Sequence, residues 1–459
     1  MEALVPSSFR DPSGFLFHSD GSIYRRINES YRENYDCLME SGLYKELVDS
    51  GLLIPHEEVS IESPVASGAY RILKPEIVPF ISYPYEWCFS QLKDAALATL
   101  EIQKKALSHG MSLKDSSAFN IQFVKGKPVL IDTLSFEKYL EGYPWVAYRQ
   151  FCQHFLAPLA LMSIKDVRLG QLSRVYIDGV PLDLASALLP PRTRFSFSMQ
   201  LHIHLHAKSQ QKHADTVVDK SKFVPKVSLQ SLLGLIDSLH GTVAGLKWQP
   251  EGTEWGEYYQ DDSYTSDGLE HKQRIVSGYL DTVKARTVWD LGANTGLYSR
   301  IAAEKGANVI SFDIDPACVE KNYLEMSGNG EERILPLMLD LTNPSPRIGW
   351  ENDERMSVGD RGPADLITAL ALIHHLAISN NVPFDRIADF LGRSCDWLII
   401  EFVPKSDHKV KKLLATREDV FPHYTQEDFE EVFSRVFEIR ASDKIENSER
   451  TLYLMSRRQ

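Results

Sequence analysis

A chain of 459 residues is longer than one hydrophobic core usually supports, so two domains are expected. Its 43% hydrophobic and 25% charged residues are typical of a soluble globular protein, and its net charge of −13 argues against nucleic-acid binding. Five scattered cysteines without a C-x-x-C pair indicate reduced thiols, so a cytoplasmic protein is expected. The N-terminus predicts no secretory signal, and no apolar stretch is long enough to predict a membrane span.

The first predicted domain covers residues 1–205 and mixes strands with helices. Residues 14–26 predict a hairpin, and residues 93–107 and 145–161 predict helices on either side of a polar loop. In that loop Asn120 follows Asp115 by five residues, and after a second hairpin Asp132 ends a β-prone stretch.

This order of Asp115, Asn120 and Asp132 resembles the catalytic and metal-binding loops of kinase-like phosphotransferases, such as the aminoglycoside phosphotransferases. The resemblance implies that Asp115 orients an acceptor hydroxyl while Asn120 and Asp132 hold magnesium. However, the hairpin lacks a glycine-rich phosphate loop, and Arg25 or Arg26 stands where a lysine is expected without being equivalent to it. We therefore expect a degenerate kinase-like domain of α+β type; an active phosphotransferase and a chance resemblance are the alternatives.

Alternating histidines occur in residues 201–206, Leu-His-Ile-His-Leu-His. On a strand they would share one face and could bind a metal, but three same-face positions give a cramped tetrahedral site and no cysteine or acid pair completes it. A polar face of a strand or helix is the better interpretation, and no metal site is predicted. The polar residues 206–228 predict a linker to a second domain at 229–459.

The second domain carries the most informative pattern in the chain. Residues 287–289 predict a buried strand, Asp290-Leu-Gly-Ala-Asn-Thr-Gly296 a glycine turn, residues 297–305 a helix, and residues 308–315 a strand that ends in carboxylates. Strand, glycine turn, helix, strand and acid in this order are typical of a Rossmann-like nucleotide site. Further strands are predicted at 335–341, 364–373, 396–404 and 450–456, with a helix at 426–437.

The D-x-G-x-x-x-G turn resembles motif I of class I S-adenosylmethionine-dependent methyltransferases, with Asn294 in place of the middle glycine. A dinucleotide-binding enzyme is the weaker alternative, because Asp290 would repel a pyrophosphate. The resemblance covers residues 229–459 and implies an α/β fold with a seven-stranded Rossmann-like sheet and helices on both faces. It also implies S-adenosylmethionine as cofactor, bound by Asp290, Gly292, Ala293, Asn294, Gly296, Asp313, Ile314, Asp340, Leu341 and Leu370.

Two of the acids near this motif have simpler interpretations. Asp340 could instead cap the turn that follows it, and Asp315 before Pro316 is better explained as a helix N-cap than as a ligand contact. Upstream, Tyr264 and Lys272 could contact the carboxylate of the cofactor's methionine portion; ordinary packing of the aromatic residues in this segment is the equal alternative.

The catalytic candidates follow the fourth and fifth strands. A hydroxyl acceptor must lose a proton, and His374 and His375 come directly after a predicted strand whose carboxyl end should open onto the ligand. His375 is preferred as the base, and Glu401 is a second candidate, for acceptor binding. The chain as a whole resembles large bacterial methyltransferases labelled nodulation-related. The expected function is methylation of a small-molecule or carbohydrate-like acceptor; the alternative is a bifunctional or regulatory protein whose first domain binds nucleotide or a partner.

Overall fold

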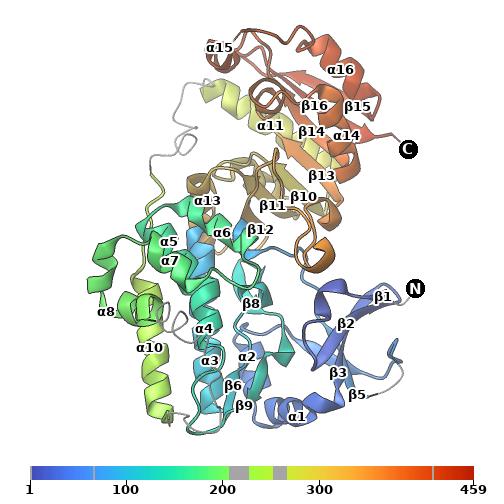
Figure 1. Ribbon diagram of the computed structural model, residues 1–459. Coiled ribbons are helices and arrows are strands. Elements are labelled where there is room, and N and C mark those ends of the chain that lie inside the picture. The colour runs from blue at the N-terminus through green and yellow to red at the C-terminus, as the bar shows by residue number, and fades with distance from the viewer. Residues whose placement is uncertain (1–2, 66–67, 206–226, 252–265, 416–417, 459) are drawn as a thin grey trace. The chain divides into compact units, whose positions relative to one another are not determined.

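The computed structural model describes residues 3–65, 68–205, 227–251, 266–415 and 418–458 (Figure 1). Contacts divide the chain into two compact units: Met1–Gln249 with Arg347–Arg355, and Pro250–Pro346 with Met356–Gln459. The predicted linker at 206–228 lies outside the described residues except for its last two positions. Within the described ranges, none of the helices is long and apolar enough to cross a membrane.

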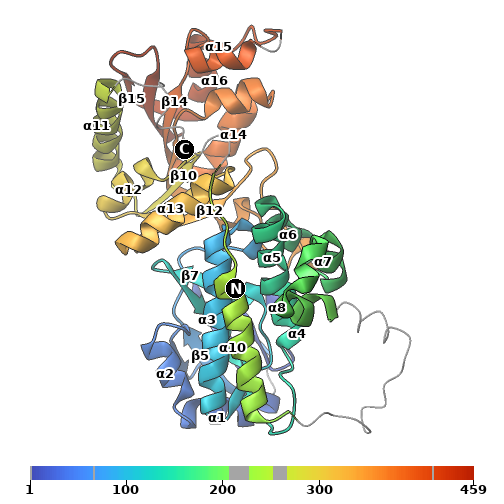
Figure 2. The same ribbon diagram turned by 90° about the vertical axis from the view of Figure 1, so that its left-hand side faces the viewer.

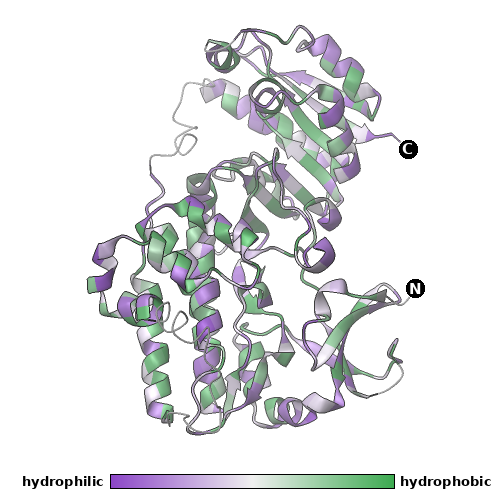
Figure 3. Ribbon diagram, viewed as in Figure 1, coloured by the Kyte–Doolittle hydropathy of each residue, from purple (hydrophilic) through white to green (hydrophobic). Residues whose placement is uncertain are grey.

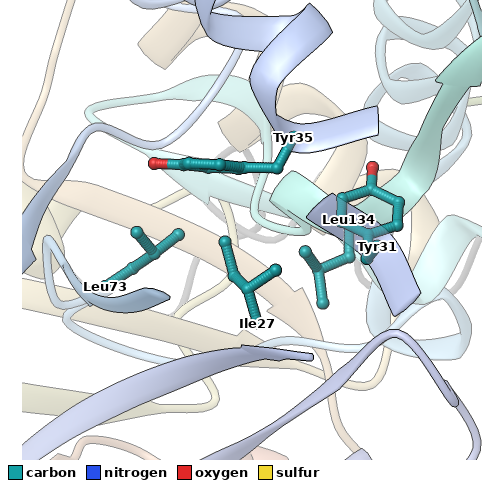
Figure 4. Close-up of a cluster of buried hydrophobic side chains, with 5 residues drawn as sticks. All are labelled: Ile27, Tyr31, Tyr35, Leu73 and Leu134. Atoms are coloured by element: carbon teal, nitrogen blue, oxygen red, sulfur yellow. The ribbon is translucent and has the colours of Figure 1, made fainter. Parts of the chain in front are cut away.

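The first unit begins with an antiparallel five-stranded sheet whose strand order is β1-β2-β3-β5-β4. Its elements are β1 (Ala3–Leu4), β2 (Gly14–Ser19), β3 (Ser22–Asn28), α1 (Arg32–Glu40), α2 (Leu43–Asp49), β4 (His56–Val59) and β5 (Ala69–Pro75). The predicted hairpin at 14–26 corresponds to β2 and β3. Apolar side chains bind α1 to the sheet in a buried cluster of Ile27, Tyr31, Tyr35, Leu73 and Leu134 (Figure 4). Leu134 is two residues after Asp132, so this cluster also anchors the loop that carries Asp132.

The rest of the first unit is mainly helical, with one short hairpin, β7–β8, and a two-stranded sheet in which β6 pairs with β9. Its elements are α3 (Phe89–Ser108), β6 (Met111–Leu113), β7 (Ile121–Val124), β8 (Lys127–Leu130), β9 (Phe136–Lys138), α4 (Tyr148–Phe151), the π-helix η6 (Cys152–Leu156), α5 (Ala157–Ile164), α6 (Leu172–Val175), α7 (Leu182–Leu188), α8 (Phe197–Met199), the π-helix η9 (Gln200–His204) and α10 (Leu229–Gly245). The predicted helices at 93–107 and 145–161 correspond to α3 and to the run α4, η6 and α5.

Helix α10 belongs to the first unit, which corrects the domain boundary predicted at residue 229. It lies along α3 (Figure 2) and buries Leu232, Ile236 and Leu239 at helical spacing. The Lys104 ammonium is 2.9 Å from the Asp237 carboxylate. The leucine periodicity predicted the helix but could not predict which core it would cover.

The second unit is built on a seven-stranded sheet with strand order β12-β11-β10-β13-β14-β16-β15. Its elements are α11 (Ser266–Val283), β10 (Thr287–Leu291), α12 (Leu297–Glu304), β11 (Asn308–Asp313), α13 (Pro316–Asn329), β12 (Ile334–Met338), β13 (Ala364–Ala369), the π-helix η13 (His375–Ser379), α14 (Phe384–Ser394), β14 (Cys395–Phe402), α15 (His408–Leu414), α16 (Gln426–Ser434), β15 (Phe437–Lys444) and β16 (Thr451–Arg457). Five neighbouring strands pair in parallel: β12, β11, β10, β13 and β14. Strand β16 pairs antiparallel with β14 and with β15.

This sheet confirms the Rossmann-like arrangement predicted for the second domain. Its strands are largely apolar (Figure 3), because helices cover both faces: α11, α12 and α13 on one and α14 and α16 on the other (Figure 2). Strand order reverses between β10 and β13, so the carboxyl ends of these strands flank the switch point where ligands bind in open α/β sheets. Strand β15 was not predicted, because its second half is mainly polar and does not show the alternation of apolar and polar residues that marks a strand.

Candidate cofactor site

The glycine turn after β10 is held against the next strand by its own backbone. The Gly292 and Ala293 amides both donate to the Phe312 carbonyl oxygen, each at 2.9 Å. Asn294, which replaces the expected glycine, has a φ of +52°. Asparagine tolerates this left-handed region better than most residues, so the turn keeps its shape without that glycine.

Asp313 at the end of β11 faces this turn. Its Oδ2 accepts a 2.7 Å hydrogen bond from the Asn294 amide, and its Oδ1 accepts one of 2.9 Å from the Asp315 amide. Burial raises the pKa of Asp313 to about 6, although both amides oppose that shift. A carboxylate offers about four acceptor positions, so after these two bonds it can still accept from two hydroxyl groups.

A cavity of about 330 Å³ opens at this edge of the sheet, within the roughly 300–1,000 Å³ usual for small-molecule sites. All the predicted cofactor residues except Gly296 line it: Asp290, Gly292, Ala293, Asn294, Asp313, Ile314, Asp340, Leu341 and Leu370. Sequence reasoning missed other lining residues, among them Leu269, Tyr298, Leu372 and Leu413. These are ordinary apolar or aromatic residues in helices and loops, and no motif distinguishes them from core residues.

Gly296 serves packing instead. It stands at the start of α12 with a φ of +87°, and a Cβ there would lie 2.4 Å from Oδ1 of Asn322. The prediction that Gly296 contacts the cofactor is therefore not supported. Glycine is favoured here because this φ is left-handed and because a Cβ would displace the side chains of Asn322 and Arg300.

Asp290 lies in the cavity wall with both carboxylate oxygens engaged. Its Oδ2 accepts from the Ser299 hydroxyl at 2.6 Å and its Oδ1 from the Thr368 hydroxyl at 2.7 Å. Burial raises its pKa, opposed first by these two hydroxyls and then by the charge of Lys272. Asp290 thus ties α12 and β13 to the glycine turn while leaving a negative group at the wall.

A network of four charges, three of them buried and Asp407 partly buried, lies beside the cavity, and we call it the Arg450 hub. Arg450, fully buried, binds Asp407 through Nε at 2.7 Å and approaches Glu401 Oε1 at 3.5 Å. Glu401, also fully buried, pairs through Oε2 with the Lys272 ammonium at 2.7 Å. Lys272 itself lines the cavity, 4.9 Å from the centre of the Tyr298 ring. The two acids and two bases satisfy one another, as buried charges must.

The hub corrects the role expected for Glu401. Its carboxylate is not exposed and does not line the cavity, so it is not placed to contact an acceptor. The position at the end of β14 was predicted, but its buried partners, Lys272 on α11 and Arg450 just before β16, come from distant sequence.

The two histidines after β13 have different environments. His374 is 2% exposed and does not line the cavity, and burial holds its pKa well below the usual value. His375 is half-buried and lines the cavity; burial, then the charges of Arg450 and Lys409, lower its pKa to about 4. Of the pair, only His375 is therefore positioned to contact a bound molecule, as a neutral imidazole at pH 7.

The simpler interpretations of two acids agree with the geometry. Asp315 caps α13, because its Oδ1 accepts from the Ala317 amide at 2.8 Å, and it does not line the cavity. Asp340 does line the cavity, while its Oδ1 also accepts from the amide and hydroxyl of Thr342. Tyr264, predicted with Lys272 beside the cofactor, lies outside the described residues.

In the first unit, the three residues of the kinase-like pattern lie in one polar cluster. The Asn120 amide donates to the Ser135 hydroxyl at 3.3 Å, and that hydroxyl donates to Asp132. Asp115 accepts from the Gln150 amide, and burial raises its pKa. Arg25 on β3 places Nη1 2.5 Å from Oδ1 of Asp132, with both side chains largely buried. The carboxylate expected to hold a metal is thus paired with a guanidinium.

The alternating histidines occupy η9 and are bound by hydroxyl groups. His202 contacts the Tyr148 hydroxyl at 2.7 Å and that of Ser238 at 3.0 Å; His204 contacts those of Ser186 at 2.7 Å and Thr193 at 2.9 Å. They are buried polar residues in a helix, and His206 lies outside the described part of the chain.

The sheet order, the glycine turn and the acid at the end of β11 define the second unit as a Rossmann-like α/β domain. The chain is 36% identical to nodulation protein NoeA of Rhizobium meliloti (strain 1021) over 462 residues, which covers 99% of this chain and 96% of that protein. It belongs to the family of NoeA. No family model matches the chain.

Among solved structures, the magnesium protoporphyrin IX methyltransferase of Synechocystis PCC 6803 with bound SAH is 18% identical, with a TM-score of 0.32; the match covers 44% of this chain and 93% of that one. The bifunctional kinase-methyltransferase WbdD is 17% identical, with a TM-score of 0.30, over 47% of this chain and 45% of its own.

Proposed function

We propose that the second unit is an S-adenosylmethionine-dependent methyltransferase. The observation that carries the proposal is Asp313: a buried carboxylate at the end of β11, fixed by two backbone amides, lines a cavity beside the glycine turn. Its remaining acceptor positions suit the two ribose hydroxyls of a nucleoside, and each charge-assisted bond contributes about 1.5–3 kcal/mol.

The other lining residues suit the remaining parts of this cofactor. We assign Ile314, Asp340 and Leu341, which also line the cavity, to an adenine ring, with apolar side chains for its faces and a carboxylate for its amino group. Lys272 offers a cation for the carboxylate of the methionine portion, and the Asp290 carboxylate favours its ammonium group. A dinucleotide fits less well, because a pyrophosphate at the glycine turn would meet the Asp290 carboxylate.

When bound, S-adenosylmethionine supplies an electrophilic methyl group on a positively charged sulfur. The protein must then hold an acceptor atom in line with it and exclude water, and such alignment can contribute roughly 7–11 kcal/mol. Leu372, His375 and Leu376 after β13, and Leu413 of α15, line the part of the cavity assigned to the acceptor.

The test is transfer of label from methyl-labelled S-adenosylmethionine to small molecules in a cell extract, with the intact protein. We expect labelled product with the wild type and little with Asp313→Asn at a subsaturating cofactor concentration. Equal labelling by the two proteins would contradict the proposed site.

We also propose that the first unit is a kinase-like domain that does not transfer phosphate. The supporting observation is the Arg25–Asp132 ion pair, which occupies the carboxylate that magnesium would need. We expect no magnesium-dependent ATP hydrolysis by the intact protein. Hydrolysis that disappears in Asp132→Ala would show instead that this unit is an active phosphotransferase.

A further inference from the structure

The part of the cavity assigned to the acceptor is lined by leucines from two segments that are far apart in the sequence. Leu372 and Leu376 follow β13, and Leu413 belongs to α15. All three residues are half-buried, so the cavity leaves part of their apolar surface open to solvent. Covering such surface is favourable in proportion to its area, which favours a ligand with an apolar body.

The backbone after β13 is strained where it brings Leu372 to the cavity. Ala371 has a φ of +50°, in the left-handed region that disfavours alanine. Consecutive residues of a regular strand point to opposite faces, yet Leu370, Ala371 and Leu372 all line the cavity. The Cδ1 atom of Leu372 is 3.4 Å from the position that a Cβ on Gly292 would take. The strained backbone thus places an apolar side chain directly against the glycine turn.

The charged residues of the cavity belong to its cofactor part. In the described ranges of the chain, the acids and lysines that line the cavity are Asp290, Asp313, Asp340 and Lys272, and each is assigned above to the cofactor. The described lining residues after β13 and on α15 include no acid, lysine or arginine. A charged acceptor group buried there would lack a partner of opposite sign, which is costly away from water. The lining therefore favours an uncharged acceptor.

Polar side chains are few in the acceptor part of the cavity, as far as the structure describes the chain. They are His375, which is half-buried, and Ser379 and Asn380, which are exposed. The Asn380 side chain is already bound, since its Nδ2 donates to the His375 carbonyl oxygen at 2.9 Å. A sugar would bury several hydroxyl groups here, and each hydroxyl left without a partner costs free energy. This part of the cavity suits a molecule with few polar groups.

We propose that the acceptor is an uncharged small molecule with a hydrocarbon body and few hydroxyl groups, and that Leu372, Leu376 and Leu413 enclose this body. The inference rests on the methyltransferase function proposed above and narrows the class of its acceptor. It excludes free sugars, which the sequence left open as carbohydrate-like acceptors. Binding of such a body displaces water from the leucines beside the methyl group, as the transfer requires.

The experiment uses the intact protein, methyl-labelled S-adenosylmethionine and a small-molecule cell extract separated on a reversed-phase column at neutral pH. Acceptor activity is expected in fractions that the column retains and an organic solvent elutes. These fractions should pass through an anion exchanger and a cation exchanger without being retained.

With those fractions, Leu413→Ser should raise the apparent KM for acceptor roughly 3- to 10-fold, because it removes apolar contact from a half-buried position. The affinity for S-adenosylmethionine should stay unchanged, and Leu413→Met should remain close to the wild type. Leu414→Ser is the matched control: Leu414 is the next residue of α15 and is also half-buried, but it does not line the cavity.

Acceptor activity only in the fraction that the reversed-phase column does not retain would overturn the inference, as would equal KM values for Leu413→Ser and Leu414→Ser. Retention of the acceptor activity on either ion exchanger would also overturn it, because the acceptor would then be charged. In these cases labelled product still forms, so the methyltransferase proposal stands. Absence of labelling in every fraction would overturn the methyltransferase proposal itself and this inference with it.

Discussion

Cofactor affinity should depend on the ionisation of Asp313, and the change Asp313→Asn should remove that dependence. Burial raises the pKa of this carboxyl to about 6, so roughly 97% of the free protein carries the ionised form at pH 7.5 and about 10% at pH 5. Hydroxyl donors favour the ionised form, so a bound ribose lowers this pKa. The dissociation constant for S-adenosylmethionine should therefore rise about tenfold between pH 7.5 and pH 5.

In Asp313→Asn the dissociation constant at pH 7.5 should be roughly 10- to 100-fold higher and nearly constant down to pH 5. Asparagine keeps one carbonyl oxygen, but its amide nitrogen must face one of the two backbone amides that now donate to the carboxylate. Calorimetric titration at both pH values measures the affinity, and thermal unfolding without ligand reports any loss of folding. A tenfold pH effect that persists in Asp313→Asn would refute this reasoning.

Three further changes test the surroundings of the site. Gly296→Ala should lower the midpoint of thermal unfolding, because the new Cβ would lie 2.4 Å from Asn322 Oδ1. Gly306→Ala is the control: its φ is +92°, but nothing lies within 4 Å of a Cβ there, so the midpoint should fall less. Equal unfolding midpoints for the two variants would contradict the packing role of Gly296. Glu401→Gln should lower the free energy of unfolding, measured in urea, by about 3–5 kcal/mol, because it leaves the buried cations Lys272 and Arg450 without their shared carboxylate. An unchanged free energy of unfolding would contradict the hub. Lys272→Met should weaken S-adenosylmethionine binding about tenfold, measured by calorimetry, but leave adenosine binding unchanged. Equal weakening of the binding of both ligands would contradict a contact between Lys272 and the methionine portion.

Short, local patterns predicted most of the second unit. Three features depend mainly on neighbouring residues and could therefore be predicted from the sequence: the glycine turn at 290–296, the strand-ending acid Asp313 and the helix N-cap Asp315. Glu401 was misjudged because its partners, Lys272 and Arg450, are 129 and 49 residues away and meet it only through strand and helix packing. Solvent access and charge balance are tertiary properties.

Similar reasons explain the errors in domain organisation. The apolar stripe of α10 predicts a helix that needs a core, but α3 and the second unit are equally plausible partners until the fold is known. The segment Arg347–Arg355 belongs to the first unit although the second unit surrounds it in sequence, and no composition change marks it. Arg25 was recognised as a departure from the kinase-like pattern, but its ion pair with Asp132 required the structure.

The most direct test of the central claim is a parallel calorimetric titration of the intact protein with S-adenosylmethionine and with NAD at pH 7.5. We expect one S-adenosylmethionine site per chain and no binding of NAD, because the Asp290 carboxylate beside the glycine turn would repel a pyrophosphate. Binding of NAD without binding of S-adenosylmethionine, or binding of neither, would contradict it.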